Sequence, residues 1–267
     1  MRILITGHKG IIGQNIMSYL ETKHEVAGYD FHPENLPLVK DYDWVIHLGA
    51  ISSTTETDVD KVILHNYEFS KWLFNQCNQY NVNMQYASSA SVYGNTTHFK
   101  EDGPSDPKSP YAWSKYLFDR WVTGIHPKII FQGFRYFNVY GPHEEHKGNQ
   151  ASPITKFTKQ AQEEGKITIF TDSENYKRDF ICVTDICKIH EKMFDIKEKG
   201  IYNIGTGKAV SFKQVADLIA KKYNAKIKYI PMPENLKHQY QSYTCANLEK
   251  LNTVLKFKFQ TIEEYLK

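Results

Sequence analysis

The stretch RILITGHKGIIG, residues 2–13, decides the fold of this chain. Its apolar start predicts a short buried strand over 2–6, and a helix is predicted directly after the turn. Between the two, Gly7, Gly10 and Gly13 form a GxxGxxG pattern. Glycine allows a close backbone approach, and a helix N-terminus offers free N–H groups to a pyrophosphate. The pattern predicts a dinucleotide-binding turn, although a structural turn without a ligand also fits it.

The next predicted strand, 26–29, leads to Asp30, which follows Gly13 by 17 residues. A carboxylate there can accept hydrogen bonds from ribose hydroxyls and repels a 2′-phosphate, so it favours NAD over NADP. Only 13 residues separate Asp30 from the following strand, which starts near Trp44. This is too short for the usual segment, so we expect the third strand of the standard order 3-2-1-4-5-6 to be missing or reduced. We therefore expect a more open adenine pocket and weaker cofactor binding.

Strands alternate with helices in the first half of the chain, which predicts an α/β fold with a Rossmann-type, doubly wound parallel sheet. After about residue 145 the alternation weakens, and we expect a small C-terminal α/β lobe that binds the substrate. We assign 1–145 and about 176–204 to a dinucleotide-binding domain, and about 146–175 and 205–267 to the substrate lobe. The predicted strands are 2–6, 26–29, 44–48, 84–87, 129–135, 167–170 and 201–204, and the predicted helices are 10–21, 61–80, 111–123, 153–164, 183–194 and 212–223.

Composition narrows the class of protein. The 33 basic and 30 acidic residues leave a net charge of +3, too small an excess to imply nucleic acid or a membrane as a partner. No apolar run reaches the about 18 residues of a membrane helix, and no signal peptide is expected, so we expect a cytoplasmic protein. The four cysteines form no CxxC pair, and His143 and His146 stand three positions apart rather than the four of a zinc-binding helix. No metal site is therefore expected.

A YxxxK pattern, Tyr111 to Lys115, lies on the predicted helix 111–123. Positions i and i+4 share one face of a helix. A free tyrosine has a pKa of about 10, and a neighbouring ammonium lowers that pKa, which makes the phenol a usable base. Ser89 follows a predicted strand, where its hydroxyl can bond a substrate oxygen. YxxxK alone also fits two surface residues, but its combination with Ser89 and the glycine turn predicts an active site.

Longer stretches carry a resemblance to a known family. They are HLGAISSTTE (47–56), NYEFSK (66–71), FRYFNVYGP (134–142), HKG (146–148), SENYKRDF (173–180) and YNIGTG (202–207). The chain resembles the extended short-chain dehydrogenases/reductases of the nucleotide-sugar epimerase group, over nearly its whole length except about 31–42. RYFNVYGP and NIGTG are shared by many sugar-nucleotide enzymes. SSTTE, HKG and SENYKRDF are more particular to the ADP-glycero-manno-heptose 6-epimerases within this group.

The resemblance implies an NAD- or NADP-dependent enzyme, with one cofactor per subunit, that epimerises a nucleotide-diphosphate sugar through a transient ketone. It implies that Tyr111 is the general acid/base, Lys115 its cofactor-linked partner and Ser89 the active-site hydroxyl. Lys147 resembles a second proton donor and acceptor on the opposite face of the sugar, although a solvated loop lysine is the alternative interpretation. Homo-oligomers are also implied.

The expected contacts fall into two groups. Arg178 is expected on the diphosphate, because a guanidinium fork suits phosphate oxygens. The expected cofactor contacts are Gly7, Gly10, Ile11, Ile12, Gly13, Asp30, Leu48, Gly49, Ala50, Ser52, Asn66, Tyr111, Lys115 and Val139. The expected substrate contacts are Ser89, Asn138, Asn149, Lys156, Phe170, Thr171, Asp172, Ser173, Arg178 and Tyr240.

Other functions stay open at this point. A 4-epimerase acting on a hexose would use Tyr111 without Lys147. A non-catalytic nicotinamide-binding protein is a further alternative, although such proteins usually lack the tyrosine or the lysine. Dehydratases of the group carry an Asp-Glu pair where this chain has Ala90-Ser91, so a 4,6-dehydratase is disfavoured. The cofactor is open as well, because Asp30 favours NAD whereas the resembled 6-epimerases are usually associated with NADP.

Overall fold

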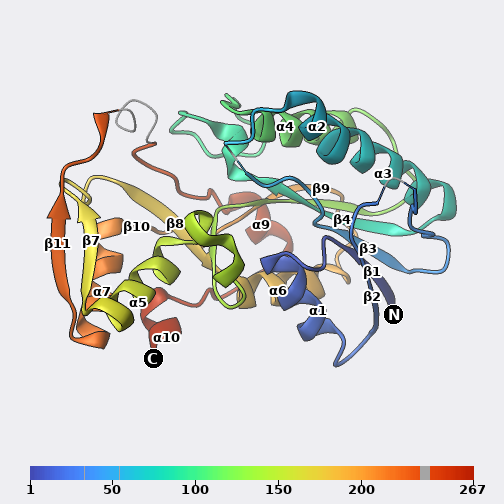
Figure 1. The fold of residues 1–267 in the computed structure, drawn as a ribbon. Helices are drawn as coiled ribbons and strands as arrows, with labels where there is room; N and C mark the ends of the chain where they lie inside the picture. Colours follow the sequence, from blue (N-terminus) through green and yellow to red (C-terminus); the bar gives the residue numbers. More distant parts are fainter. Residues whose placement is uncertain (33, 54, 235–240) are drawn as a thin grey trace.

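The fold is known from a computed structural model that describes residues 1–32, 34–53, 55–234 and 241–267. Its main element is a six-stranded parallel sheet with the strand order β2-β1-β3-β4-β5-β9 (Figure 1). The strands of this sheet are β1 (Arg2–Thr6), β2 (Glu25–Tyr29), β3 (Trp44–His47), β4 (Asn83–Ser89), β5 (Phe131–Tyr136) and β9 (Gly200–Ile204).

The sheet confirms the predicted doubly wound fold and the missing third strand. Thr6 of β1 stands between Tyr29 of β2 and His47 of β3, so the chain crosses directly from one side of β1 to the other. Among the described residues between β2 and β3, no strand is formed, and β2 is the edge of the sheet. The linker after Asp30 is too short for a helix–strand–helix unit, which is the physical reason for the loss.

Helices cover both faces of the sheet. In Figure 1, α2, α3 and α4 lie over one face, and α1 and α6 lie together against the other. Parallel strands covered on both faces are buried, which explains the continuous apolar runs of β1 and β3. The helices are α1 (Ile11–Leu20), α2 (Val59–Ile63), α3 (Phe69–Tyr80), α4 (Pro110–Thr123), α5 (Pro153–Glu164), α6 (Val183–Met193), α7 (Phe212–Tyr223), α9 (Glu249–Val254) and α10 (Ile262–Leu266).

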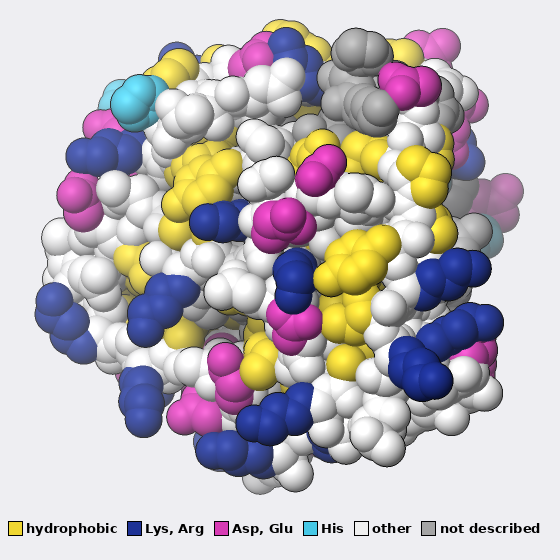
Figure 2. Space-filling view, turned by 90° about the vertical axis from the view of Figure 1, so that its left-hand side faces the viewer, with side chains coloured by type: hydrophobic (Ala, Val, Ile, Leu, Met, Phe, Trp, Pro, Cys, Tyr) yellow, Lys and Arg dark blue, Asp and Glu magenta, His cyan; other side chains and the backbone are white. Residues whose placement is uncertain are grey.

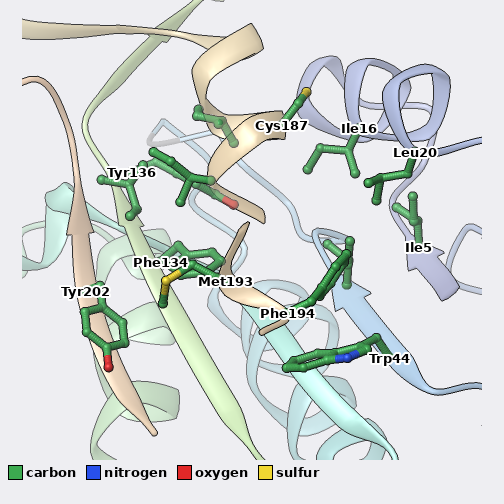
Figure 3. Close-up of a cluster of buried hydrophobic side chains, with 14 of the residues drawn as sticks. Ile5, Ile16, Leu20, Trp44, Phe134, Tyr136, Cys187, Met193, Phe194 and Tyr202 are labelled. Atoms are coloured by element: carbon green, nitrogen blue, oxygen red, sulfur yellow. The ribbon is translucent and has the colours of Figure 1, made fainter. Parts of the chain in front are cut away.

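The largest apolar core fills the space between the sheet and the pair α1–α6. Ile16 and Leu20 of α1 face this space at the spacing of one helix turn, and Cys187 of α6 points toward them (Figure 3). Trp44 and Phe194 close the cluster with tilted rings whose centroids are 5.1 Å apart. This packing fixes α1, and with it the glycine turn, against the sheet.

The helical run predicted as a single helix over 61–80 contains a wider turn. It consists of α2, a π-helix η1 (Leu64–Glu68) and α3. Apolar periodicity does not reveal such a π-turn, because it adds one residue without interrupting the helix. π-turns inside helices occur frequently at functional sites. His65 and Asn66 lie in it, and both take part in the site described below.

The remaining strands form two smaller sheets on the left in Figure 1. β8 (Lys177–Cys182) lies between β6 (Asn138–Tyr140) and β10 (Ala209–Ser211), and β7 (Lys166–Phe170) pairs in parallel with β11 (Lys226–Ile230). Of these strands, only β7 was predicted. The division of the chain into two domains stays a prediction.

Sequence signals explain the helix starts in this part of the chain. Ser152 caps α5 by accepting a hydrogen bond from the Thr155 N–H, and Pro153 follows at the first helical position. Ser211 and Gln214 form a capping box at the start of α7. Both helices have the bounds predicted from the sequence. Along the described ranges, no helix has the length and apolar content needed to cross a membrane.

Candidate active site

A cavity of about 370 Å³ lies at the carboxyl ends of β1, β2 and β3, where open parallel sheets bind ligands. The glycine turn forms one wall, and the segment after β3 forms another. Ten of the expected cofactor contacts line this cavity together with five other residues. The lining consists of Gly7, Gly10, Ile11, Ile12, Gly13, Asp30, Phe31, Leu48, Gly49, Ala50, Ile51, Ser52, His65, Ala87 and Lys147.

The three glycines of the turn serve two different purposes. Gly7 has φ +70°, and a Cβ on it would lie 2.5 Å from the Gly49 nitrogen. A Cβ on Gly13 would lie 2.3 Å from the Gly7 oxygen, so both glycines are needed for the strand, the turn and the helix to pack. At Gly10 the nearest atom would be 3.4 Å away, so packing within the protein does not require a glycine there. A ligand that approaches the backbone closely would require one.

The start of α1 also fits an anionic ligand. Gly10 precedes the helix without a side-chain cap, and the first turn carries no acidic residue. The first N–H groups of a helix have no partner within it, and they attract anions such as a pyrophosphate. The uncapped helix start and the open side of Gly10 together fit the dinucleotide expected from the sequence.

Asn66 shapes this cavity from outside its lining. Its Oδ1 accepts the Ile51 N–H at 2.7 Å, and its Nδ2 donates to the Ile51 oxygen at 3.0 Å. Nδ2 also donates to the Ser114 hydroxyl of α4 at 3.1 Å. Asn66 is buried, so it holds the segment after β3 rather than facing the cavity. Val139 likewise packs against the apolar core and is not among the described lining residues.

Helix α4 brings Tyr111 and Lys115 to the end of β4. Ser109 caps α4 through the Ala112 N–H, and Pro110 stands at its first position. The Lys115 ammonium donates to the Ala87 oxygen at 2.8 Å and lies 6.0 Å from the centre of the Tyr111 ring. Because Ala87 lines the cavity, this hydrogen bond connects α4 to it.

Burial controls the protonation of this pair. It lowers the pKa of Lys115 to about 8, against an opposing effect of Asp119. Burial raises the pKa of Tyr111, and a hydrogen bond with Ser89 lowers it only in part. The expectation that Lys115 lowers the Tyr111 pKa is therefore wrong for this structure, since the Lys115 ammonium is bonded to a backbone carbonyl and Tyr111 is desolvated.

Lys147 approaches the same cavity from a distant part of the chain. It lies in a short 3-10 segment, η3 (Glu145–Gln150), which bends at Gly148 with φ 50°. Lys147 is half-buried, and burial lowers the pKa of its ammonium while Glu144 opposes this effect. The cavity thus brings Lys147 together with the glycine turn, but Tyr111 is not among its described lining residues, and the two-base hypothesis stays a prediction.

A buried carboxylate anchors the segment that carries Lys147. Glu144 accepts hydrogen bonds from the Gly141 N–H at 2.9 Å, the Ser152 N–H at 2.5 Å and the Ser152 hydroxyl at 3.0 Å. Two further hydrogen bonds join this part of the chain to other segments. Asn15 of α1 donates to the Pro142 oxygen at 3.0 Å, and Gln150 donates to the Ser53 hydroxyl at 3.1 Å. No sequence argument singled out Glu144, although it stands three positions before Lys147.

A second cavity, of about 320 Å³, lies among α5, β7 and β11. Ser173 is buried there, and its hydroxyl has no hydrogen-bond partner among the described residues, which suits a polar ligand. On the face of the molecule that β7 and β11 form, apolar patches lie among both basic and acidic side chains (Figure 2). The lining consists of Pro153, Lys156, Phe157, Gln160, Thr168, Ile169, Phe170, Ser173, Tyr176, Phe212 and Ile230.

Three of the expected substrate contacts, Lys156, Phe170 and Ser173, line this second cavity. The guanidinium of Arg178 lies 5.6 Å from the ring centre of Phe212, which is part of the lining. Other expected contacts lie outside the lining. Asn138 and Asp172 are exposed, and Thr171 is bonded to the Ile230 oxygen; Tyr240 and the side chain of Asn149 lie outside the described residues.

Several lining residues escaped the sequence analysis. Phe31 and His65 face each other in the first cavity, with ring centroids 4.6 Å apart. Phe31 directly follows Asp30 and His65 directly precedes Asn66, so adjacency to expected contacts was the available signal. In the second cavity, Phe157 directly follows the expected contact Lys156, and Tyr176 lies within the quoted stretch SENYKRDF, so the same kind of signal was present for both.

Comparison with known proteins identifies the family of this chain. Residues 3–205 match the model of the family described as NAD dependent epimerase/dehydratase. The chain is 25% identical to the ADP-L-glycero-D-manno-heptose-6-epimerase of Helicobacter pylori, with a TM-score of 0.88 over 99% of this chain and 93% of that chain. It is 25% identical to the UDP-glucose 4-epimerase of Thermus thermophilus in complex with NAD, with a TM-score of 0.78 over 95% and 92% of the two chains.

A third solved structure is similar to this chain in its fold. The UDP-N-acetylglucosamine 4-epimerase of Methanobrevibacter ruminantium is 23% identical, with a TM-score of 0.88 over 99% of this chain and 96% of that chain. The family match covers the glycine turn, the YxxxK helix and Lys147, and it confirms the resemblance and the nicotinamide cofactor expected from the sequence. The chain is therefore a member of the NAD-dependent epimerase/dehydratase family.

Proposed function

We propose that this chain epimerises a nucleotide-diphosphate sugar through a transient ketone, and that its substrate is an ADP-linked heptose inverted at carbon 6. The observation that carries the proposal is that Lys147 lines the same cavity as the glycine turn and Ala87, whose carbonyl binds Lys115. Lys147 thus lies at the cavity itself, and Tyr111 stands outside its described lining, on the helix that the Lys115 hydrogen bond connects to Ala87. The stretches SSTTE, HKG and SENYKRDF, which are more particular to the heptose 6-epimerases, support the choice of sugar.

The residues of the first cavity would hold the dinucleotide. The N–H groups at the start of α1 would bind the pyrophosphate, Asp30 the adenosine ribose, and 48–52 the nicotinamide half. When bound, the nicotinamide accepts a hydride from the sugar carbon and returns it. The second cavity would hold the nucleotide of the substrate, with Ser173 and Lys156 as polar contacts.

Inversion requires proton transfer on both faces of the sugar carbon. In the first half-reaction, one of Tyr111 and Lys147 would accept the hydroxyl proton as the carbon loses its hydrogen as a hydride. After the ketone has turned, the other group would return a proton to the carbonyl oxygen as a hydride returns to the carbon. Burial lowers the Lys147 pKa. A larger fraction of the side chain is then the neutral amine, which can act as a base. Ser89, beside Tyr111, would bind the oxygen during both steps.

A hexose 4-epimerase is the second candidate, and the 25% identity with the Thermus thermophilus enzyme favours it. That reaction would use Tyr111 alone, because the ketone rotates past a single base. Dependence on Lys147 therefore distinguishes the two functions.

The test compares Lys147→Ala and Tyr111→Phe with the unchanged chain, using ADP-glycero-manno-heptose and UDP-glucose as substrates. Removal of either proton-transferring group is expected to lower turnover of the heptose by about 10²–10⁴-fold. Lys108→Ala, at an exposed loop lysine paired with Asp106, serves as the control and keeps full turnover. Unchanged heptose turnover in Lys147→Ala would refute the two-base proposal. Turnover of UDP-glucose alone would favour the 4-epimerase.

A further inference from the structure

Ser152 connects the segment η3 to the helix that lines the second cavity. Its hydroxyl caps α5 by accepting the Thr155 N–H at 3.2 Å, and the same hydroxyl donates to Glu144 Oε1 at 3.0 Å. Pro153, the next residue, lines the second cavity, and so does Lys156, whose N–H donates to the Ser152 oxygen at 3.0 Å. The start of α5 is therefore bonded to Glu144 and also forms part of the second cavity.

Glu144 joins this helix start to Lys147. Its backbone oxygen accepts the Lys147 N–H at 2.9 Å, while its side-chain oxygens accept the N–H and the hydroxyl of Ser152. Glu144 is buried, so water does not compete for these hydrogen bonds. A shift at the start of α5 therefore reaches Lys147, because Glu144 is bonded to both places.

The charge of Glu144 also acts on two lysine side chains. Burial lowers the pKa of the Lys147 ammonium and of the Lys156 ammonium, and Glu144 opposes this effect in both cases. A carboxylate acts on an ammonium in this way only from a short distance. Glu144 thus stands near one lysine that lines the first cavity and near another that lines the second.

The rest of η3 does little to fix Lys147. The segment has six residues and bends at Gly148, which has φ 50°. Among the described residues, a Cβ on Gly148 would meet no atom within 4 Å, so the bend lies in open space. The hydrogen bonds that Asn15 and Gln150 make to other segments are exposed to water. The buried bonds of Glu144 are therefore the main restraint on the position of Lys147.

We propose that Ser152 is a positioning residue, through which a nucleotide bound in the second cavity sets the position of Lys147 in the first. The nucleotide contacts the start of α5, and Ser152 and Glu144 pass the resulting shift to Lys147. Binding energy from a part of the substrate that does not react is then used to orient a group at the reacting carbon. The proposal rests on the place that the proposed function gives to the nucleotide, and not on the sugar that is turned over.

The test measures the rate at which acetic anhydride acetylates the Lys147 side chain, by mass spectrometry of the full chain with and without ADP or UDP. NAD is kept at saturation, so that the added nucleotide does not occupy the first cavity, and calorimetry gives the nucleotide dissociation constant. In the unchanged chain, bound nucleotide should change the Lys147 labelling rate several-fold.

The variant Ser152→Gly removes the hydroxyl, and glycine is tolerated at a helix cap, so α5 should still form. It should bind the nucleotide with a similar dissociation constant, but its Lys147 labelling should no longer respond. Ser152→Thr keeps a hydroxyl and should restore the response. The matched control is Thr261→Gly, which removes the cap of α10 and should leave the response unchanged.

Steady-state kinetics give a second readout. Ser152→Gly should lower kcat for the nucleotide sugar by about tenfold or more, because Lys147 loses its position. KM should change much less, since the contacts to the nucleotide remain. Ser152→Thr should recover most of kcat, which a general loss of folded protein would not explain.

Each result has a defined meaning. A Lys147 labelling rate that bound nucleotide leaves unchanged overturns the role of Ser152. So does a response that persists in Ser152→Gly, because the nucleotide then contacts Lys147 directly. Failure of the unchanged chain to bind either ADP or UDP overturns this proposal together with the nucleotide site of the proposed function. A response that depends on Ser152, in a chain that turns over neither sugar, supports the present proposal and rejects the epimerase.

Discussion

The two regions that carry the proposed proton-transferring groups, Tyr111 and Lys147, are built in different ways. Tyr111 and Lys115 lie on a helix of 14 residues whose inner face is fixed by buried polar groups. Lys147 lies on a segment of six residues, divided by the kink at Gly148, whose buried anchor is Glu144. The positions of Tyr111 and Lys115 follow from the regular spacing of a helix. The position of Lys147 depends on contacts between residues of separate segments.

Buried charge holds the α4 region in place. Asp119, one turn beyond Lys115, accepts hydrogen bonds from Tyr86 at 3.0 Å, Ser88 at 2.8 Å and Arg135 at 2.9 Å. The side chains of Asp119 and Arg135 are only 1% and 3% exposed, so water screens neither charge. Substitutions of the buried groups that hold α4 should therefore mainly lower the stability of the protein. Substitutions that loosen the Lys147 segment should mainly lower its activity.

The largest effect is expected from Asp119→Asn. The change leaves the Arg135 guanidinium buried without its counter-charge, which costs about 3–5 kcal/mol of unfolding free energy. Urea unfolding, followed by fluorescence of the tryptophans, measures this loss. The double variant Asp119→Asn, Arg135→Met should recover part of the stability, because it removes the unpaired charge. A loss below about 1 kcal/mol in the single variant would show that α4 does not depend on this pair.

A smaller loss of stability is expected when the pH is lowered. His47, under the site, bonds Thr6 at 2.6 Å and Ser70 at 2.7 Å, and burial lowers its pKa to about 3. The unfolded chain binds a proton near the ordinary pKa of 6.5, so the contribution of His47 is complete above pH 6.5 and is lost progressively toward pH 3.

Between pH 6.5 and pH 5, this linkage removes about 2 kcal/mol. His190 has the same lowered pKa and contributes in the same direction, so the test compares the unchanged chain with His47→Gln. The variant is expected to be less stable at pH 7, and the difference should narrow as the pH falls to 5. A difference that is constant with pH would refute the role of His47.

The smallest effect on stability is expected from Glu144→Gln, at about 1–2 kcal/mol, because hydrogen bonds to the buried carboxylate are weakened. Turnover of the nucleotide sugar should still fall by about tenfold or more, since Lys147 loses its position. KM is measured beside kcat, because Glu144 also bonds Ser152 at the start of α5 and its charge acts on the Lys156 ammonium; the larger change is expected in kcat. Glu163→Gln, on the exposed face of α5, is the matched control. An unchanged turnover would show that Lys147 does not depend on Glu144.

Much of the site followed from local patterns in the sequence. The glycine turn and Asp30 were expected from their pattern and spacing, the segment 48–52 was implied by the resemblance, and the structure brings the three to one cavity. The loss of the third strand followed from a chain segment that is too short for it. The strands β6, β8, β10 and β11 were not predicted. β6 and β10 have only three residues each, too few to show a periodicity, and β8 begins with three charged residues, Lys177, Arg178 and Asp179.

The sequence by itself determined the elements whose geometry is local: the turn that begins α1, the four-residue spacing of Tyr111 and Lys115, and the apolar strands of the buried sheet. Only the tertiary structure decided that Glu144 anchors Lys147, that Phe31 and His65 share the first cavity, and that burial raises the Tyr111 pKa. Backbone geometry repeats at fixed intervals, so it can be read along the chain. Desolvation and contacts between loops depend on which distant residues meet, and no interval in the sequence encodes that.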